Sequence, residues 1–317
     1  MTVSLAQLVL YGCAASVLAW LSTSALERCA APLGLLDIPN HRSLHNRITP
    51  RGGGLAFVGV SLVLTVAATY VLGIPLSPGI RGLWLGSVVV GAVSLADDLW
   101  HISWTVRFSV HVAGALILVA SGGTVNEVIL PTGVAWELGW MELPLTVLWV
   151  VGLTNAYNFM DGIDGLAAGQ AVVTAAAMAY LSYLRGGDVT ALSLAILAGS
   201  VFGFLLRNWS PAAIFMGDIG SAFLGFTFAG WAVLSGEAWS GVLPLAAWVV
   251  VLAPFLLDAG ITLALRIARG RQWHQPHREH LYQRLVQSGW SHRAVSGLYI
   301  GAAAVLAIAA ISVFAKW

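Results

Sequence analysis

Ten long apolar runs follow one another along the chain, and they constrain the fold more than any other feature. A helix needs about 20 apolar residues to cross a bilayer, and most of the runs approach that length. Backbone polar groups inside lipid must be satisfied internally, so such runs form helices. The sequence therefore predicts an all-α polytopic membrane protein, a single integral-membrane domain over residues 1–317. The expected spans are 4–26, 54–73, 82–96, 106–122, 143–157, 167–185, 189–206, 219–235, 241–263 and 295–315.

The composition fits a chain embedded in a lipid bilayer. Only 9% of the residues are charged and 58% are hydrophobic, whereas soluble domains carry about 25% charged residues. The net charge of +1 and the lack of a basic run give no sign of a nucleic-acid partner. Cys13 and Cys29 lie near opposite ends of the first run, roughly 20 Å or more apart along a helix, too far for a disulfide. That run lacks a positively charged start, which indicates a retained span.

The distribution of basic residues predicts the orientation in the membrane. Twelve of the fifteen Lys and Arg residues fall in one set of connections, and only Arg81, Arg185 and Lys316 fall on the other side. We therefore expect the arginine-rich side to be cytoplasmic and both termini to lie outside. On the outer side, residues 125–138 alternate apolar and polar positions around a Pro-Thr-Gly turn, which predicts a short hairpin.

Five aspartates fall on the arginine-rich side, at the ends of predicted spans and not at their centres. Several adjoin glycine, which allows backbone to approach a ligand closely. Acids that meet where separate loops converge indicate a functional site. These aspartates are Asp97, Asp98, Asp161, Asp164 and Asp218.

Asp97 and Asp98 are adjacent at the end of the third span. Neighbouring residues cannot share one helix face, so their carboxylates are expected to project differently. Two nearby carboxylates raise each other's pKa, which suits a catalytic base near neutral pH, with the other carboxylate serving metal binding or structure. A helix end with two solvated acids is the alternative.

The segment NAYNFMDGIDGL places Asn155, Asn158, Asp161 and Asp164 at intervals of three residues. On a helical turn the two carboxylates would share a face, and the two amides would extend that face backwards. Amides read a nucleobase or ribose through paired donors and acceptors, which predicts substrate binding by the asparagines. Asp164 also suits the N-cap of the following span, so it is expected to cap while Asp161 binds.

Asp218 lies between two glycines where the eighth span begins, in the segment RNWSPAAIFMGDIGS. A carboxylate there suits Mg²⁺, which keeps several waters and is completed by substrate phosphates. Phe215 is placed to stack on a base and Asn208 to hydrogen-bond it, although membrane packing is the simpler explanation for Phe215.

Two further segments carry groups that bind anions. The stretch RGRQWHQPHREHLYQRL is the most polar in the chain, and its imidazole and guanidinium groups suit a diphosphate. The nearby carboxylates and the absence of a neighbouring cysteine favour Mg²⁺ over zinc there, and a basic stretch touching anionic lipid heads is the alternative. Three glycines after Pro50 and Arg51 open the second span. The candidate anion contacts in these two segments are His274, His277, Arg278, His280, Arg42, His45 and Arg51.

Taken together, the motifs TPRGGG, ADD, NAYNFMDGIDGL, NWSPAAIFMGDIGS and HREHLYQRL resemble, in this order, those of the bacterial polyprenyl-phosphate N-acetylhexosamine-1-phosphate transferases, glycosyltransferase family 4. The resemblance covers nearly the whole chain, and the peptidoglycan-precursor translocase is a more distant relative. It implies a bacterial inner-membrane enzyme with cytoplasmic active-site loops. Such an enzyme transfers an N-acetylhexosamine-1-phosphate from a UDP-sugar such as UDP-GlcNAc to undecaprenyl phosphate and releases UMP. This would be the first membrane step of O-antigen, lipopolysaccharide or other surface-polysaccharide synthesis.

The resemblance also implies roles for individual residues. Asp218 is the expected main metal ligand, for Mg²⁺ or for Mn²⁺ in its place. Asp97 or Asp98 would deprotonate or position the lipid phosphate. The remaining expected contacts are Asn158, Asp161 and Asp164 in the nucleotide and metal pocket, His277 and His280 at the diphosphate, and Asn208 and Phe215 at the uridine.

Some positions depart from the translocase branch. His101 stands where that branch has a lysine, and Arg278 and Glu279 separate two histidines that are consecutive there. Together with Arg107, these differences favour a plain N-acetylated sugar over the muramyl-pentapeptide substrate, which stays the alternative. Asp258 lies inside the ninth span, where an unpartnered charge is costly. We expect an arginine of the adjacent loop or a substrate group to pair with it.

Two other function classes fit less well. A transporter of anionic solutes needs charged groups near the bilayer midplane, and an intramembrane aspartyl protease needs two facing aspartates inside the bilayer. The acids of the candidate site lie at the ends of the predicted spans, and only Asp258 lies within a span. The sequence leaves open which N-acetyl sugar is used, the length of the lipid chain and whether the protein forms a homodimer.

Overall fold

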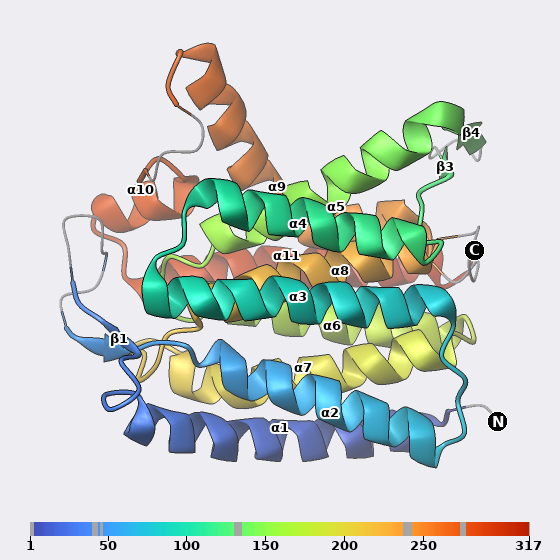
Figure 1. Cartoon of the computed structure of the whole chain (residues 1–317), viewed down its shortest axis with the longest axis horizontal. Helices are drawn as coiled ribbons and strands as arrows, with labels where there is room; N and C mark the ends of the chain where they lie inside the picture. Colours follow the sequence, from blue (N-terminus) through green and yellow to red (C-terminus); the bar gives the residue numbers. More distant parts are fainter. Residues whose placement is uncertain are drawn as a thin grey trace.

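The computed structural model describes residues 3–39, 44, 47–129, 135–236, 243–272 and 277–316. Within these ranges the long helices run side by side in a bundle (Figure 1). The helices are α1 (Leu5–Cys29), α2 (Gly54–Val71), α3 (Pro78–Trp100), α4 (Trp104–Ala120), α5 (Glu142–Phe159), α6 (Leu166–Leu184), α7 (Asp188–Asn208), α8 (Gly217–Leu234), α9 (Leu245–Ala268), α10 (Leu281–Gln287) and α11 (His292–Phe314).

Each of the ten predicted spans coincides with one of the long helices, and α10 is a short helix between the last two. Eight of the described helices are long and apolar enough to cross a membrane. The other two long helices are α4, with 17 residues, and α5, with 18 residues. Both pack directly on helices that meet the criterion, α3 and α8. The prediction of an all-α polytopic membrane protein is confirmed.

The two ends of the bundle differ. The N- and C-termini lie at one end, and α10 lies at the other together with a two-stranded ribbon, β1 (Leu36–Asp37) and β2 (Thr49–Pro50) (Figure 1). The second ribbon, β3 (Glu127–Ile129) paired with β4 (Ala135–Glu137), lies at the end with the termini. This pairing confirms the predicted hairpin. We call the end with α10 the site end.

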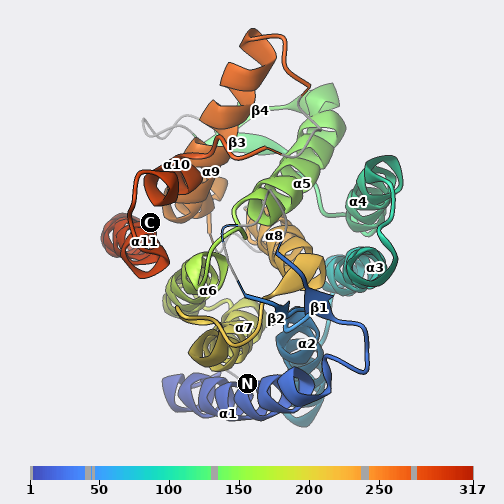
Figure 2. The ribbon, with the colours of Figure 1, turned by 90° about the vertical axis from the view of Figure 1, so that its left-hand side faces the viewer.

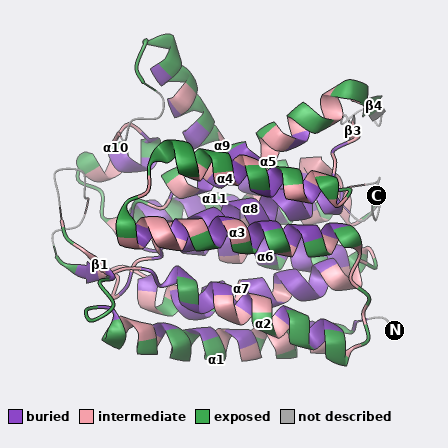
Figure 3. Ribbon diagram, in the orientation of Figure 1, coloured by how far each residue is buried: buried purple, intermediate pink, exposed green. Residues whose placement is uncertain are grey.

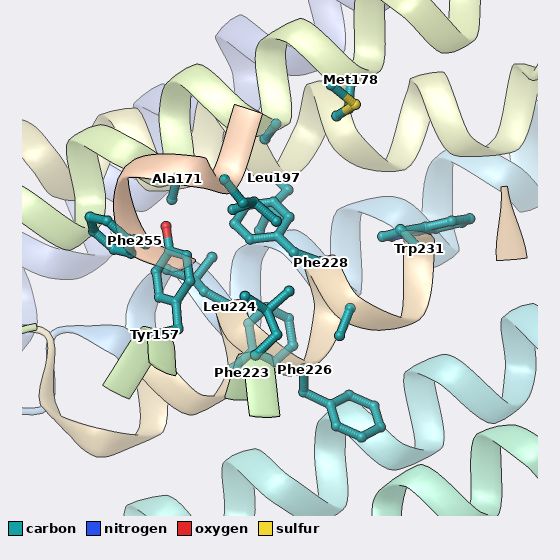
Figure 4. Packing of buried hydrophobic residues seen from close by; sticks show 14 of the residues in the cluster. Tyr157, Ala171, Met178, Leu197, Phe223, Leu224, Phe226, Phe228, Trp231 and Phe255 are labelled. Atoms are coloured by element: carbon teal, nitrogen blue, oxygen red, sulfur yellow. The ribbon is translucent and has the colours of Figure 1, made fainter. Parts of the chain in front are cut away.

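Helix α8 lies at the centre of the bundle, in contact with α2, α3 and α5, and it is buried along nearly its whole length (Figures 2 and 3). Aromatic side chains fill the space around it (Figure 4). The ring of Tyr157 lies 5.7 Å from that of Phe228 and 5.0 Å from that of Phe255, measured between centroids. The Tyr157 hydroxyl donates to the Ala167 carbonyl oxygen at 3.0 Å, so the one polar atom of this ring is satisfied. The core thereby fixes the position at which α8 reaches the site end.

Helix α1 packs on α7 through small residues. A Cβ atom on Gly199 would overlap the Gly12 carbonyl oxygen, and one on Gly203 would overlap the Ser16 carbonyl oxygen. Close approach of this kind is how membrane helices gain packing energy where lipid removes the hydrophobic driving force. Only Leu8, Ala15, Ala19 and Thr23 of α1 are buried, and the helix lies at the edge of the bundle (Figure 3).

We expect Gly199→Ala to destabilise the protein by about 1–3 kcal/mol, because the new methyl group must push the α1 backbone away. Gly301→Ala is the matched control, since a Cβ atom on Gly301 meets nothing within 4 Å. Thermal unfolding in detergent measures both. Equal melting temperatures for the two variants would show that the α1–α7 packing is not as close as described.

Candidate active site

A polar cavity of about 310 Å³ opens at the site end. Its walls come from segments far apart in the sequence: β1, the start of α2, the end of α3, the α5–α6 and α7–α8 loops, α10 and the start of α11. Asp98, Asp161, Asp164 and Asp218 all line it. Four of the five aspartates that the sequence singled out are thus brought together in one cavity.

Asp98 caps the N-terminus of α8. Its Oδ1 atom accepts from the Asp218 N–H and its Oδ2 atom from the Ile219 N–H, both at 3.1 Å. A carboxylate is favoured there by the unpaired N–H groups and by the helix dipole. Gly217, the first residue of α8, has a φ of 76°, and a Cβ atom there would lie 2.7 Å from Asp98 Oδ2. The Gly-Asp pair of this motif is therefore explained by the cap, which holds Asp218 at the cavity wall.

The three-glycine segment brings α2 against the start of α8. The Gly53 N–H donates to the Phe215 carbonyl at 2.9 Å, and the Gly54 N–H donates to the Met216 carbonyl at 2.8 Å. A Cβ atom on Gly54 would lie 2.5 Å from the Gly220 Cα atom. These glycines allow the starts of α2 and α8 to touch. The sequence predicted that the glycine backbone would pass close to a substrate, whereas in the structure it passes close to the backbone of α8. Arg51, just before them, lines the cavity and donates to the backbone carbonyl of Asp98.

Asp97 points away from Asp98, as predicted, and toward α4. Its Oδ2 atom lies 2.6 Å from Arg107 Nη1, and the same nitrogen lies 2.8 Å from Asp218 Oδ2. Arg107 thus bridges two carboxylates that would otherwise repel each other. Asp97 does not line the polar cavity, so its contact with the cavity passes through Arg107.

Asp161 stands in the loop between α5 and α6, half-buried on the cavity wall. Burial, and then the negative charge of Asp98, raise the pKa of Asp161 to about 7. A carboxyl group in this state is poorly compensated by the protein around it. Asp161 is therefore placed to bind a cation or to exchange a proton near neutral pH.

Asp164 is held differently. Its Oδ2 atom accepts from the Ala212 N–H at 3.2 Å, and its Oδ1 atom lies 3.3 Å from His292 Nδ1. Burial acts to raise the pKa of Asp164, but the contacts with His292 and Ala212 outweigh it and the pKa is lowered. The prediction that Asp164 caps α6 is wrong, because Gly165, with φ of 73°, is the N-cap residue and α6 has no side-chain cap. Asp164 instead ties the α5–α6 loop to the α7–α8 loop and to α11.

Asn208 and Phe215 both line the cavity, as expected. The Asn208 Oδ1 atom accepts from the Gly165 N–H at 3.0 Å, and its Nδ2 atom donates to the Ile214 carbonyl at 2.9 Å. Through these two hydrogen bonds, the Asn208 side chain holds the α5–α6 loop and the α7–α8 loop together. Phe215 is half-buried and leaves part of its ring toward the cavity.

The two other amides of this motif do not reach the cavity. Helix α5 ends at Phe159, so the helical face expected to join the asparagines to the aspartates does not form. Asn155 lines a different, apolar cavity between α4, α5 and α9, and its Nδ2 atom donates to the Val151 carbonyl at 2.7 Å. Asn158 lies in the last turn of α5 and is not among the residues that line the polar cavity.

The histidine segment is also placed differently from the prediction. The rings of His277 and His280 lie 4.8 Å apart, next to Phe159, and neither lines the polar cavity. Burial, and then His280, lower the pKa of His277 to about 4. Arg278 faces a groove between α9 and α11. The candidates Arg42, His45 and His274 lie outside the described residues.

The cavity also has three polar residues that the sequence did not reveal, Asp37, Gln283 and His292. Gln283 follows His280 by one helical turn, so the polar segment indicated the right helix but the wrong face. His292 lies directly after the N-cap Ser291 of α11, and Asp37 stands at the ribbon β1. For His292, the only signal in the sequence was its position as a polar residue at the start of a predicted span on the side of the other candidate loops.

Asp258 is partnered by backbone and a hydroxyl group. Its carboxylate accepts from the N–H groups of Leu281 at 2.8 Å and Tyr282 at 3.1 Å, and from the Tyr299 hydroxyl at 2.6 Å. No arginine pairs with Asp258 in the described residues, so that part of the prediction is wrong. The Asp258 carboxylate instead accepts hydrogen bonds from the N–H groups at the start of α10, which have no partner within that helix. Asp258 thereby fastens α10 to α9 and α11.

The donor set of the cavity fits a hard divalent cation. The five acids on its wall are all aspartates, and carboxylates are the ligand type of Mg²⁺. Among the described residues, Arg51 is the one arginine that lines it. Within the described residues no group of three His, Cys, Asp or Glu stands close enough to hold a metal alone. Mg²⁺ commonly uses only one or two carboxylates and takes its other ligands from water and phosphate. Asp218 and Asp161 are the residues that would hold it.

We expect Asp98→Ala to lower the free energy of unfolding by several kcal/mol, because two N–H groups would lose their partner at about 1–3 kcal/mol each. Asp98→Asn keeps one acceptor oxygen and should lose less. Asp97→Ala is the neighbouring control, since in the described contacts the Asp97 carboxylate accepts no hydrogen bond from a backbone N–H group. Thermal unfolding ranks the three variants, and equal losses at positions 97 and 98 would contradict the cap.

We expect Asp161→Asn to raise the melting temperature in EDTA, and the gain to grow with pH. The unfolded carboxyl ionises near 3.8 and the folded one near 7. Ionisation of the Asp161 carboxyl group therefore lowers the free energy of unfolding by an amount that grows as the pH rises from 3.8 to 7 and reaches its full size above pH 7. The gain should increase from pH 5 to pH 7 and then level off. A gain that does not change over this range would contradict the raised pKa.

Comparisons with known proteins agree with this arrangement. Residues 80–236 match the family model described as glycosyl transferase family 4. The chain is 36% identical over 278 residues to the probable undecaprenyl-phosphate N-acetylglucosaminyl 1-phosphate transferase of Bacillus subtilis, covering 86% of this chain and 75% of that protein. It is 31% identical over 322 residues to the decaprenyl-phosphate N-acetylglucosaminephosphotransferase of Mycobacterium tuberculosis, covering 92% and 79%.

A more distant match fits the same family. The chain is 33% identical over 216 residues to the phospho-N-acetylmuramoyl-pentapeptide-transferase of Streptococcus equi subsp. zooepidemicus, covering 64% of each protein. The resemblance seen in the sequence motifs is confirmed: the chain belongs to glycosyl transferase family 4, the polyprenyl-phosphate N-acetylhexosamine-1-phosphate transferases.

Proposed function

We propose that this protein transfers an N-acetylhexosamine-1-phosphate from a UDP-sugar to a polyprenyl phosphate such as undecaprenyl phosphate, and releases UMP. The observation that carries the proposal is a carboxylate-lined cavity close to an apolar one. The first suits a cation-bound diphosphate, and the second suits a long apolar chain. Among donors, UDP-N-acetylglucosamine is favoured, because the Bacillus and Mycobacterium relatives carry that sugar in their names.

The apolar cavity supports a lipid acceptor. It measures about 780 Å³ and is bounded by α4, α5 and α9. Along α5 it extends from Leu143 to Phe159, a rise of about 24 Å. The Phe159 carbonyl accepts from the Tyr282 hydroxyl at 3.0 Å, and a Cβ atom on Gly162, next to Asp161, would touch that same hydroxyl. A chain in this cavity would therefore bring its phosphate toward the carboxylates.

The chemistry follows from the cavity residues. A phosphate oxygen of the lipid attacks the sugar-bearing phosphorus, a new P–O bond forms, and the P–O bond to UMP breaks. A phosphate monoester has a second pKa near 6, so the acceptor is mostly dianionic at pH 7.5 and needs little help from a base. A bound divalent cation would neutralise the diphosphate and stabilise the charge that develops in transfer.

The protein residues then bind and orient. Arg51 and His292 are placed to contact phosphate oxygens, and Phe215 offers a ring face to the base. Asp218 and Asp161 supply carboxylates, and Asp98 positions Asp218 through its hydrogen bonds to the start of α8. Asp97 orients Arg107 and in this proposal is not the base.

The location is part of the proposal. The site end carries most of the arginines, and the positive-inside rule assigns such an end to the cytoplasm. Both termini would then lie outside, since they are at the opposite end of the bundle (Figure 1). The enzyme would act in the bacterial inner membrane at the first membrane step of a surface polysaccharide, O-antigen being one candidate.

A donor panel tests the reaction directly. Purified protein, undecaprenyl phosphate and Mg²⁺ are offered UDP-GlcNAc, UDP-GalNAc, 6-deoxy UDP-N-acetyl sugars and UDP-MurNAc-pentapeptide, and UMP release is followed. We expect UMP from an N-acetylhexosamine donor, none with EDTA, and a loss of at least about 100-fold in Asp218→Ala, the order of effect of removing one stabilising group at the reacting centre. UMP release that persists in EDTA would contradict the cation, and release only from the muramyl donor would contradict the substrate class.

The lipid site has its own test. Gly152 lines the apolar cavity, and a Cβ atom there meets nothing within 4 Å, so Gly152→Phe fills the cavity without disturbing the helices. We expect a rise of about tenfold or more in the KM for undecaprenyl phosphate and little change in the KM for the UDP-sugar. Gly301→Phe, with the same freedom on α11, is the control. Equal acceptor KM values in the two variants would contradict the placement of the lipid.

A further inference from the structure

A separate groove of about 810 Å³ runs between α9 and α11. Leu257, Ile261 and Leu265 of α9 form one apolar wall, and Leu298 and Leu306 of α11 form the other. Leu257 is 59% exposed and Leu298 is 51% exposed, so protein does not cover these walls in the described residues. Leu298 and Leu306 are eight residues apart, about 12 Å along the helix. The apolar part of the groove therefore extends into the depth expected for lipid chains.

The groove ends in positive charge at the site end. Arg269, Arg271, Arg278 and Arg284 line this end, together with one half-buried acid, Glu279. Glu279 is already paired with Arg271 at 2.6 Å, and Arg266 lies 2.5 Å from the same carboxylate oxygen. Arg269 and Arg284 make no ion pair with a described residue. The end of the groove thus keeps uncompensated positive charge.

The second acid on the wall does not change this balance. Asp258 is buried, and its oxygens accept from the Leu281 and Tyr282 N–H groups and from Tyr299. The groove consequently combines apolar walls at the depth of the lipid chains with a cationic end outside that apolar layer. A molecule with apolar chains and an anionic head matches both parts, since each basic residue near the membrane surface adds to the attraction of an anionic lipid.

This groove is set apart from the reacting centre. It shares no lining residue with the polar cavity, and α10 lies between the two. Tyr282 and Gln283 are buried on one face of α10, whereas Leu281 and Arg284 are exposed on the groove side. A phosphate held by Arg269 and Arg284 would face away from Asp218. The occupant is therefore not the molecule that reacts.

We propose that the α9–α11 groove binds an anionic glycerophospholipid of the surrounding bilayer, with its acyl chains between α9 and α11 and its head at Arg269 and Arg284. The bound lipid contacts Leu281 and Arg284 on the outer face of α10. It thereby supports the helix whose inner face places Gln283 at the polar cavity. The proposal concerns binding alone and does not depend on the transfer reaction.

Native mass spectrometry of the purified protein with phosphatidylglycerol tests the proposal. We expect one tightly bound copy, and a loss of affinity of at least about tenfold in the double variant Arg269→Gln and Arg284→Gln. The control is Arg81→Gln with Arg185→Gln, which removes the same charge at the opposite end and should change the affinity less than twofold. Phosphatidylcholine, which has no net charge, should bind at least about tenfold more weakly than phosphatidylglycerol.

A second variant tests the same groove independently, in case the double arginine variant does not fold. Ala302→Trp fills the apolar part of the groove and should also reduce phosphatidylglycerol binding, whereas Gly301→Trp, one residue away and outside the groove, should not. Three results would overturn the proposal: unchanged affinity in the folded double variant, equal affinity for the two phospholipids, or displacement of phosphatidylglycerol by undecaprenyl phosphate. The last result would assign the groove to the acceptor.

Discussion

The carboxylate of Asp98 holds the site together. By accepting from the N–H groups of Asp218 and Ile219, it joins the end of α3 to the start of α8. The glycines at 53 and 54 let α2 reach the same point, because a side chain on Gly54 would clash with α8 and one on Gly53 would clash with Phe204 of α7. Arg51 is anchored by the backbone carbonyl of Asp98. Three helices from distant parts of the chain therefore meet around the buried carboxyl group of Asp98, and the cavity lies where they meet.

Surplus negative charge is the second constraint. Five carboxylates line the cavity, and Arg107 already bridges Asp97 and Asp218. The pKa of Asp161 is raised to about 7 by burial and by Asp98, so the protein alone does not compensate this carboxyl group. A divalent cation with a diphosphate would supply the missing compensation. Family membership and the acidic cavity are two independent observations that support the proposed sugar-phosphate transfer.

The sequence predicted the features that depend on local pattern. The ten long helices, the 125–138 hairpin and the clustering of four of the five aspartates follow from hydropathy, turn residues and charge, and the structure confirms them. Eight of these helices are long and apolar enough to cross a membrane. Features that depend on where a helix stops were not predictable. Because α5 ends at Phe159, Asn155 faces a lipid-sized cavity and not the aspartates. His280 and Asp258 serve the attachment of α10, while Gln283 and His292 reach the cavity through tertiary packing that no spacing rule reveals.

The central claim is that the cavity holds a divalent cation together with a nucleotide diphosphate. Electron paramagnetic resonance of Mn²⁺ in the presence of UDP, with detection of phosphorus hyperfine coupling, tests it most directly. We expect one bound Mn²⁺ per chain, coupled to phosphorus, and loss of that coupling in Asp218→Ala but not in the distant Arg81→Gln. Bound Mn²⁺ without phosphorus coupling, or coupling that survives Asp218→Ala, would contradict this account of the site.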